Sequence, residues 1–550
     1  MKHVHRLAFC ALLGASLASC ETAPVLSGGD IYEDVPPEMP TSYVGKTKNL
    51  PIYQILVYSF ADGNGDGIGD FQGIIDRLDY LKSLNVGYLW LSPIHPSPTY
   101  HHYDVKDYYA IDETYGGLDG FKALIAAAKE KGIGIVMDMV FNHASKESQW
   151  FQDACNSYSN HVKDGTLEAM KADPNDVGND FVLSNVREEV SGQRHSINWN
   201  NVGLYYEGNF SSQMPEFNLK SPSVKKKQAA ILKHYLDLGV AGFRFDGCRY
   251  FMLSSAQDSV AYLDELAAEA RKLKSDVLLV GEWWDGFSQS TLDQVTSTMP
   301  LFNFPTCSGA GMRAGMVNYA YQRREPYSFA SRVYENQKTT LNKSGGLNHP
   351  VYFLNNHDMN RYAPKDSEDL VKLTAASYLL TPGTPTIYYG EEILLKGTRG
   401  GEGTDAARRL PMQWIGDASK DTLRPTKIYD GVKEPKDQVT VGALEEIERE
   451  GSITNYYKKV LQFRADHPEI GYGIHLTYGR DSEKLSMNRI VVDGNTKGYL
   501  VHNMSNEPQM TAIMPEGLEL DTSISLGKDY YQGCRLQLSP YSTVYLEVKD

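Results

Sequence analysis

The chain has 550 residues, a net charge of −15 at pH 7, 41% apolar residues and 22% charged residues. This composition is typical of a globular protein rather than a disordered one, and the length favours two or three domains. The negative charge argues against nucleic acid and against anionic membrane surfaces as partners, and it does not disfavour an uncharged ligand.

The first twenty residues, 1–20, are typical of a bacterial lipoprotein signal peptide. Two basic residues precede the apolar run 7–17, which is too short to span a bilayer. The run is followed by a Leu-Ala-Ser-Cys sequence that resembles a lipobox, in which lipid is attached to Cys20. An ordinary secretory signal with a chance cysteine is the alternative. Residues 21–49 contain several Pro, Gly and Ser and little periodicity, so we predict a tether.

These features predict an exported protein that reaches the membrane through a lipid anchor only. The expected location is the outer membrane or the cell surface, and the periplasmic face of that membrane also remains open. No segment after the signal peptide is long and apolar enough to cross a bilayer.

Eight short apolar runs recur along the chain and mostly alternate with amphipathic stretches of helical periodicity. The runs lie at residues 52–60, 88–91, 133–141, 240–245, 277–283, 301–304, 351–354 and 386–389. The helical stretches lie at residues 71–84, 121–131, 224–238, 262–273 and 370–380. Alternating strands and helices predict a parallel sheet in an α/β fold, and eight units predict a closed (β/α)8 TIM barrel.

Two segments interrupt or follow this alternation. About a hundred residues separate the third run from the fourth, and a structureless loop of that length is improbable in a compact domain. We therefore predict a small inserted B domain after strand 3, at residues 143–213. After a helix at 453–463, short alternating strands with Gly and Asn turns predict a C-terminal antiparallel β-sandwich at 471–550. The predicted barrel then comprises residues 50–142 and 214–470.

Carboxylates end several of the predicted barrel strands. Arg244 and Asp246 are two residues apart, so on a strand they point to the same side and either form a structural ion pair or take part in chemistry. The other acidic endings are Asp138-Met-Val-Phe-Asn-His143, Gly281-Glu282 and Asn355-Asn-His357-Asp358. Because the carboxyl ends of barrel strands form the active face, four strands bring acids to one rim, which favours a catalytic site.

Several acids without a metal-binding triad suit glycoside hydrolysis. That reaction needs one carboxylate as the nucleophile and one carboxylic acid that protonates the leaving oxygen. The acid needs a raised pKa, which burial and neighbouring carboxylates supply. The nucleophile must stay ionised, and Arg244 beside Asp246 would favour that state.

These motifs resemble those of glycoside hydrolase family 13, the α-amylase family, and the resemblance covers residues 50–550. The segments Met214-Pro-Glu-Phe-Asn218 and Gly383-Thr-Pro-Thr-Ile-Tyr-Tyr-Gly-Glu391 resemble two further regions of the family. The resemblance implies a retaining α-glucan hydrolase. It would cleave α-1,4-glucosidic bonds in starch or maltooligosaccharides through a covalent glycosyl-enzyme intermediate.

The resemblance also implies roles for individual residues. Asp246 would be the nucleophile, Glu282 the general acid/base, and Asp358 the residue that binds sugar hydroxyls at the cleaved unit. The carboxyl groups of Asp246 and Glu282 should then lie about 5 Å apart, the separation found in retaining enzymes. The implied sugar-binding residues are Tyr103, Asp104, His143, Arg244, His357 and Arg409. For any one of them, a structural role is the alternative.

Three positions after the nucleophile depart from the family pattern. Many α-amylases have Ala and then x-Lys-His there, whereas this chain has Gly247, Arg249 and Tyr250. In the family, the Lys-His pair binds the sugar that leaves. The departure therefore affects how this sugar is bound, the length of the products, and the balance between hydrolysis and glucosyl transfer. An exo-acting α-glucosidase or oligo-1,6-glucosidase, or a transglucosylase, is therefore the alternative enzyme. A catalytically inactive barrel that binds glycans is a third reading, which the intact set of three carboxylates opposes.

A loop of alternating polar residues and glycines follows the first predicted strand. Its sequence is Asp62-Gly-Asn64-Gly-Asp66-Gly-Ile68-Gly-Asp70. Oxygen ligands at alternate positions suit a hard cation, but the twelfth position is Gly73 rather than Glu, so the loop is not an EF-hand. A polar turn in which Asp70 caps a helix is the alternative.

Relatives of oligo-1,6-glucosidase and of the starch-utilisation amylases carry such a loop with calcium, so the resemblance implies a structural Ca²⁺. The predicted ligands are the side chains of Asp62, Asn64, Asp66 and Asp70 and the carbonyl of Ile68.

Within the family, two segments and the lipobox most resemble the lipid-anchored starch-utilisation α-amylases of gut bacteria. The segments are Ser92-Pro-Ile-His-Pro-Ser97 and Tyr103-Asp-Val-Lys-Asp107. The expected partners are an α-glucan oligo- or polysaccharide and outer-membrane glycan-uptake proteins.

Overall fold

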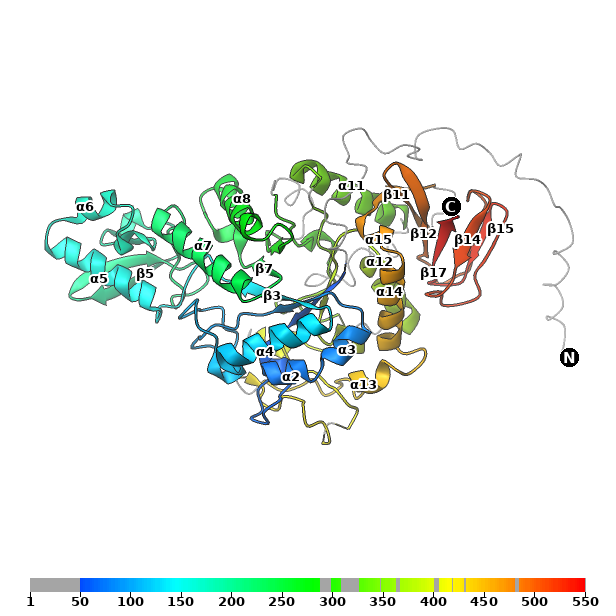
Figure 1. The fold of residues 1–550 in the computed structure, drawn as a ribbon, viewed down its shortest axis with the longest axis horizontal. Helices are drawn as coiled ribbons and strands as arrows, with labels where there is room; N and C mark the ends of the chain where they lie inside the picture. The colour runs from blue at the N-terminus through cyan, green and yellow to red at the C-terminus, as the bar shows by residue number, and fades with distance from the viewer. Residues whose placement is uncertain are drawn as a thin grey trace, which may run out of the picture.

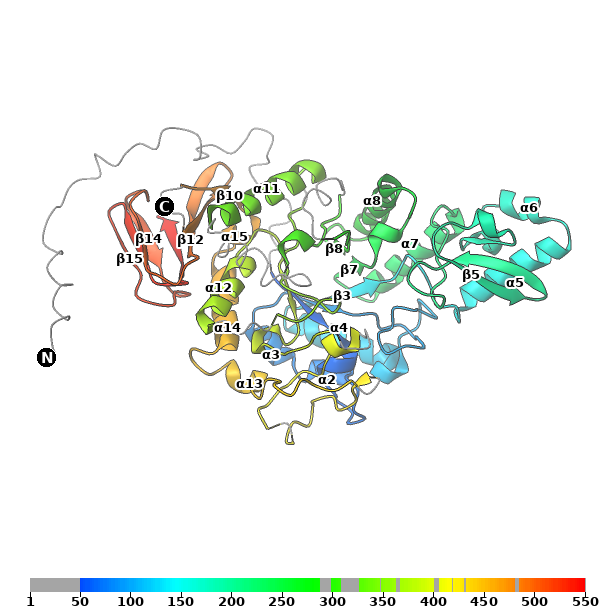
Figure 2. The same ribbon diagram turned by 180° about the vertical axis from the view of Figure 1, so that it is seen from behind.

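The computed structural model describes residues 50–286, 298–307, 326–346, 348–362, 367–399, 405–417, 419–429, 432–479 and 484–549. A central barrel carries a small inserted domain at one side and a β-sandwich at the other (Figure 1). The view from behind shows the same order of the three parts (Figure 2). The predicted signal peptide, the tether and Cys20 lie outside the described residues.

The barrel is built on a parallel sheet with the strand order β8-β7-β3-β2-β1-β9. Its strands are β1 (Ile52–Ile55), β2 (Tyr88–Leu91), β3 (Gly134–Met139), β7 (Gly242–Phe245), β8 (Leu278–Gly281) and β9 (Thr386–Tyr388). Parallel bridges join Gly281 to Leu301, Phe302 to Val351, and Phe353 to Thr386, and they complete the ring between β8 and β9. The predicted (β/α)8 barrel is therefore confirmed, although the sixth and seventh apolar runs pair through single bridges only.

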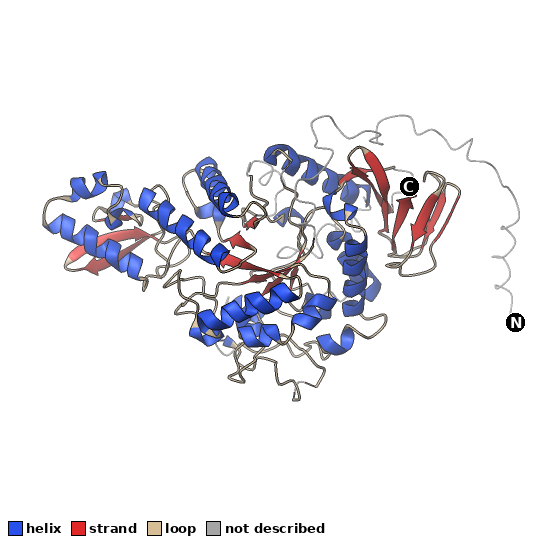
Figure 3. Cartoon of the chain, in the orientation of Figure 1, coloured by secondary structure: helices blue, strands red, loops and turns tan. Residues whose placement is uncertain are grey.

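Helices surround this sheet and cover it from outside (Figure 3). They include α4 (Gly117–Glu130), α7 (Pro222–Asp237), α8 (Ala256–Leu273), α11 (Pro326–Ser344), α12 (Glu368–Leu379), α13 (Ala443–Glu446), α14 (Ile453–Asp466) and α15 (Glu469–Tyr472). Among the described residues, none of the helices combines the length and the apolar composition that crossing a membrane requires.

Two local predictions differ from the structure. The run 52–60 is not one strand, because β1 ends at Ile55 and a short helix, α1 (Val57–Phe60), follows. The stretch 71–84 is not one helix but two, α2 (Phe71–Ile75) and α3 (Leu78–Ser83). The backbone leaves the helical region at Arg77, whose guanidinium lies 5.0 Å from the centre of the Trp414 ring, so a tertiary contact overrides the helical periodicity.

The insert between β3 and α7 packs into a core that is continuous with the core of the barrel. It contains α5 (Gln149–Lys163), α6 (Leu167–Ala172) and an antiparallel sheet of β4 (Leu183–Ser184), β6 (Val202–Glu207) and β5 (Arg194–Trp199). The ring of Phe151 packs edge-on against Phe181 and Tyr206. An antiparallel bridge from His143 to Glu216 ties the two ends of the insert together beside the barrel.

The C-terminal part consists of two antiparallel sheets, which confirms the predicted β-sandwich. One sheet contains β10 (Ile474–Thr477), β11 (Leu485–Val492), β12 (Asn495–Asn503), β17 (Thr543–Val548) and β14 (Leu518–Asp521). The other contains β13 (Gln509–Thr511), β16 (Arg535–Leu538) and β15 (Tyr530–Gln532). The preceding helix α14 is held to the barrel by the buried Arg464, which donates hydrogen bonds to the carbonyls of Leu379, Thr381 and Gly383.

Candidate active site

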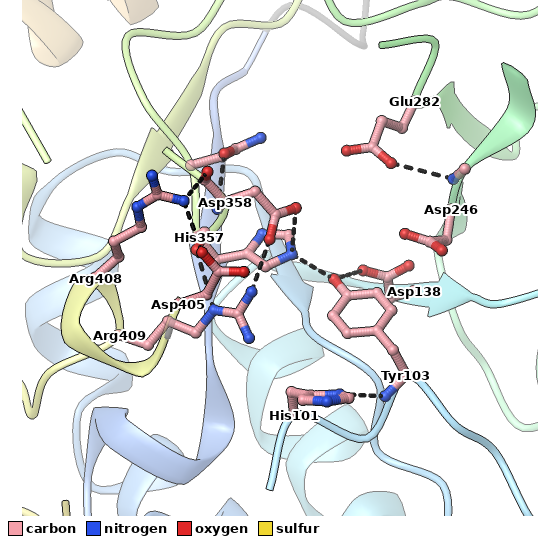
Figure 4. Close-up of polar contacts among 12 residues, drawn as sticks. His101, Tyr103, Asp138, Asp246, Glu282, His357, Asp358, Asp405, Arg408 and Arg409 are labelled. Carbon is pink, nitrogen blue, oxygen red and sulfur yellow. Dashed lines mark hydrogen bonds and ion pairs between the residues drawn. The ribbon is translucent and has the colours of Figure 1, made fainter. Parts of the chain in front are cut away.

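The acidic residues predicted from the strand endings meet at one rim of the barrel (Figure 4). Asp138 lies on β3, whereas Asp246 and Glu282 directly follow β7 and β8. Asp358 follows the bridged segment around Phe353. A cavity of about 980 Å³ opens beside them, and Asp246, Glu282 and Asp358 line it.

Arg244 holds three of these carboxylates together from beneath. Its Nη1 donates to Asp138 and to Asp246, each at 2.7 Å, and its Nη2 forms an ion pair with Glu282 at 2.9 Å. The side chain of Arg244 is fully buried and its guanidinium lies 5.0 Å from the centre of the Trp90 ring. Arg244 and Asp246 therefore form a structural ion pair and also belong to the candidate site, because Arg244 positions the acids that face the cavity.

The side chain of Glu282 is set up to hold a proton. Burial raises its pKa to about 8, and the charges of Asp246 and Asp358 add to this effect against the opposing charge of Arg244. The backbone N–H of Gly247 donates a hydrogen bond to Oε2 of Glu282 at 3.1 Å, which fixes the carboxyl group next to Asp246.

Asp358 has the opposite electrostatic environment. Although burial acts against it, the contact with His357 and the positive charge of Arg409 hold the pKa of Asp358 below its usual range. Nη2 of Arg409 donates to Oδ1 of Asp358 at 2.7 Å, and Nε2 of His357 lies 3.1 Å from Oδ2. The site thus contains one carboxyl that keeps its proton at neutral pH and one that does not.

Tyr103 lines the cavity and stacks on His357, which lies behind it. Their ring centres lie 5.4 Å apart with the planes 4° from parallel, and Oη of Tyr103 lies 2.7 Å from Nε2 of His357. The Tyr103 hydroxyl also donates to Asp138 at 3.0 Å, and Gln54 contacts Nδ1 of His357 at 2.7 Å. Burial lowers the pKa of His357 to about 3, so this imidazole is neutral.

The remaining predicted sugar-binding residues fall into two layers. Asp104, His143 and Arg409 line the cavity together with Tyr103. Asp104 accepts a hydrogen bond from Ser97 at 2.7 Å, and Nε2 of His143 bonds to the carbonyl of Tyr103 at 3.0 Å. The predicted residues Arg244 and His357 lie behind this surface, where they contact the side chains that line the cavity.

The three positions that depart from the family pattern lie in one wall of the cavity. Gly247 has a left-handed backbone (φ 56°), and an added Cβ would lie 3.1 Å from the ring of Phe210. The Phe210 ring packs edge-on against Tyr250 at 4.7 Å, and Arg249 forms an ion pair with Asp285 at 3.2 Å. This wall lies beside Glu282 and contains aromatic faces and a charged pair.

Several cavity residues belong to no motif or periodic pattern in the sequence. Phe210 belongs to the insert, Asp405 and Arg408 lie in a short 3-10 helix (Asp405–Arg408), and Tyr100 and Tyr429 come from segments far apart in the chain. Arg408 donates to the backbone carbonyl of Asp358 and to the carboxylate of Asp405. The adjacent basic pair at 408–409 is the one feature that could have drawn attention to this region.

The loop from Asp62 to Asp70 lies away from the acids and contains the donors of the predicted calcium site. Asp62 accepts hydrogen bonds from the backbone N–H groups of Gly65 and Gly67, each at 2.7 Å, and Asp70 caps α2 through Gly73. Burial raises the pKa of Asp70, and repulsion from Asp62 adds to it, which a bound cation would relieve.

The oxygen donors of this loop therefore fit a hard cation chemically. Within the part of the chain that the structure describes, however, the acidic and histidine side chains form no cluster of three that could hold a metal ion. The carboxylates bond to the backbone of the loop instead.

A (β/α)8 barrel with paired acids at the carboxyl ends of its strands is the architecture of a glycoside hydrolase. Residues 54–473 match the family model described as "Alpha amylase, catalytic domain". The chain belongs to glycoside hydrolase family 13, the α-amylase family.

The chain is similar to proteins of more than one named activity. It is 30% identical over 506 residues to "Alpha-amylase 3" of Dictyoglomus thermophilum, which covers 91% of this chain and 93% of the relative. It is 29% identical to "Glucan 1,6-alpha-glucosidase" of Streptococcus pneumoniae, over 84% of this chain and 92% of the relative. Among solved structures, Amy13B of Eubacterium rectale superposes with a TM-score of 0.78 at 26% identity, over 93% of this chain and 98% of that protein.

The raised pKa of Glu282 predicts the alkaline limit of activity. Glycoside hydrolysis needs one protonated carboxyl group, and Glu282 keeps its proton until the pH rises through its pKa of about 8. We expect kcat/KM to fall by about tenfold for each pH unit above that value. A pH profile of kcat/KM measures this limb, and an alkaline limb near pH 5 would contradict the assignment of the proton to Glu282.

Proposed function

We propose that the protein is a retaining α-glucan hydrolase that cleaves α-1,4-glucosidic bonds in starch or maltooligosaccharides. The observation that carries this proposal is the single guanidinium of Arg244 in contact with both Asp246 and Glu282, which keeps the two carboxyl groups adjacent at the cavity. Adjacent carboxyl groups, without room for a water molecule between them and the sugar, are the arrangement that retaining enzymes use.

In the proposed reaction, Asp246 attacks the anomeric carbon while Glu282 gives its proton to the leaving glycosidic oxygen. The C–O bond to the leaving sugar breaks, and an ester forms between Asp246 and the glycone. Glu282, now a carboxylate, removes a proton from water, which attacks the same carbon and releases the sugar with its configuration retained. Arg244 holds the carboxylate of Asp246 in place through a hydrogen bond of 2.7 Å, and ionised Asp358 binds the hydroxyls of the sugar that reacts.

The alternative is an exo-acting α-glucosidase or oligo-1,6-glucosidase, or a transglucosylase. The specific observation in its favour is the wall of Gly247, Arg249 and Tyr250, which replaces the family residues that bind the leaving sugar. The similarity to a relative named for α-1,6 activity supports keeping this alternative.

A product time course tests the proposal. The substrates are maltoheptaose labelled at its reducing end, soluble starch and pullulan, with the wild type and the variant Asp246→Asn compared. We expect the wild type to cleave maltoheptaose and starch. Asp246→Asn should lose turnover by about a factor of 10⁴ or more, because the nucleophile is replaced by a neutral amide of the same shape.

Each outcome of this time course has a distinct meaning. A melting temperature of Asp246→Asn equal to that of the wild type shows that the loss is chemical. Normal turnover by Asp246→Asn would contradict the nucleophile assignment. Cleavage of pullulan at its α-1,6 bonds, without cleavage of maltoheptaose, would favour the oligo-1,6-glucosidase alternative. No product from any of the three substrates would overturn the hydrolase proposal.

We also propose that the loop from Asp62 to Asp70 binds a structural Ca²⁺ through the side chains of Asp62, Asn64, Asp66 and Asp70 and the carbonyl of Ile68. The support is the donor set itself, which is rich in hard oxygen atoms, and the mutual repulsion of two buried carboxylates. Calcium would act here on stability, because the loop lies off the catalytic acids.

Chelation tests this calcium site. We expect treatment with EDTA to lower the melting temperature, because a ligand that binds only the folded state stabilises it in proportion to its occupancy. Added Ca²⁺ should restore the melting temperature of the wild type but not that of Asp66→Ala. An unchanged melting temperature in EDTA would remove the calcium proposal.

The N-terminal segment supports a further proposal on location. The lipobox predicts that the mature protein is anchored by lipid at Cys20, as in the surface starch-utilisation amylases of gut bacteria, and that it works beside outer-membrane glycan-uptake proteins. Growth with labelled palmitate should label the wild-type protein but not Cys20→Ala. Equal labelling of both, or of neither, would contradict the anchor.

A further inference from the structure

In the proposed reaction, one end of the cavity binds the sugar that leaves and the other end binds the sugar that stays. Glu282 gives its proton to the leaving oxygen, so the leaving sugar lies on the side of Glu282, Arg249 and Tyr250. Asp358 binds the sugar that stays, and Arg409 lies beyond Asp358, away from Glu282 (Figure 4). The wall behind Arg409 therefore faces the non-reducing end of the substrate.

Two tyrosines occupy that wall. The rings of Tyr100 and Tyr429 stack face to face with their centres 4.0 Å apart and their planes at 21°. Both residues line the cavity. Nη1 of Arg409 contacts Oη of Tyr100 at 3.1 Å, so the pair is connected through one arginine to Asp358.

The segment that carries Tyr429 is bound to the loop of the proposed calcium site. The carbonyl of Gly67 accepts hydrogen bonds from the backbone N–H groups of Thr426, at 3.1 Å, and Lys427, at 2.9 Å. The N–H of Asp62 donates to the carbonyl of Leu423 at 2.8 Å. These three backbone bonds hold the segment in place two residues before Tyr429.

The stacking geometry favours a barrier over a platform for sugars. An aromatic ring that binds a sugar needs a free face, but Tyr100 and Tyr429 turn a face toward each other. The ring of Tyr100 is further enclosed by edge contacts with Tyr58 and His101. The pair therefore fills space at this end of the cavity and leaves Tyr100 little surface for a second glucose unit.

We infer that the Tyr100–Tyr429 pair limits how many glucose units lie on the non-reducing side of the cleaved bond, so that the enzyme releases short units from that end of an α-glucan. This inference rests on the proposed retaining α-glucan hydrolysis and, within it, favours exo action. Tyr429, which would then select for chain length, lies about 180 residues after the nucleophile Asp246 in the sequence.

The variant Tyr429→Ala tests the barrier on maltoheptaose labelled at its reducing end. The wild type should first produce labelled chains shortened by one or two units. Removal of the Tyr429 ring opens space for a longer glycone, so the ratio of labelled tri- and tetrasaccharide to labelled hexasaccharide should rise by about tenfold, a typical effect of one pocket contact on discrimination. β-Cyclodextrin, which has no non-reducing end, should become a better substrate for the variant.

Two controls separate the barrier from other effects. Tyr429→Phe keeps the stacked ring and should restore the wild-type product pattern. Tyr530 is an exposed tyrosine on β15 of the β-sandwich, and Tyr530→Ala should change neither pattern nor rate. Melting temperatures of all three variants show whether each is folded; because the Tyr429 side chain is about one-third exposed (37%), its truncation should leave the fold intact.

The outcomes distinguish the inference from the proposed function. Cleavage of maltoheptaose by the wild type together with an unchanged product pattern in Tyr429→Ala would overturn the barrier and leave the hydrolase proposal standing. A shift of Tyr429→Ala toward shorter glycone products would show that Tyr429 binds sugar instead, which also overturns the inference. No cleavage by the wild type would overturn the proposed function and the inference together.

Discussion

The buried guanidinium of Arg244 is the interaction on which the active face of this barrel depends. A buried cation is tolerated only when it is paired at hydrogen-bond distance, and here Asp138, Asp246 and the carboxyl group of Glu282, from three neighbouring strands, contact the guanidinium. Loss of one partner from such a cluster typically costs about 3–5 kcal/mol. The cluster therefore stabilises the barrel at the place where the catalytic groups must be held.

The register of the sheet makes this cluster possible. Asp138 on β3 lies directly beside Arg244 on β7, and Arg244 lies beside Val280 on β8, two residues before Glu282. A slip of one residue would turn these side chains to the opposite face of the sheet, because strand side chains alternate. Strand pairing thus places the charged groups that surround Glu282. Local contacts then adjust the protonation states of Glu282 and Asp358.

The sequence predicts the part of the site that lies on regular structure. Arg244 and Asp246 share a strand face by spacing alone, and the acids at strand ends meet because parallel strands end at one rim. The sequence does not predict where loops go. The segment before Tyr429 is held by backbone bonds to the loop that contains Gly67, its ring then stacks on Tyr100, and no periodicity encodes such a contact. The break between α2 and α3 has the same cause, because Arg77 leaves the helix to contact a ring more than 300 residues away.

The wall beside Glu282 combines side chains from the insert and from the barrel. Phe210 is carried by the insert, whereas Tyr250 follows β7 of the barrel, and the two rings meet across the boundary. The insert packs closely on the barrel, since the Trp150 ring stacks on Tyr108 and Asp180 pairs with Lys227, but it contributes no side chain to the Arg244 cluster. A substitution at Phe210 would therefore change the exit for the released sugar while the contacts that hold the acids stay in place. In such a design, the lifetime of the product complex and the rate of bond cleavage can change independently, one through the insert and the other through the barrel.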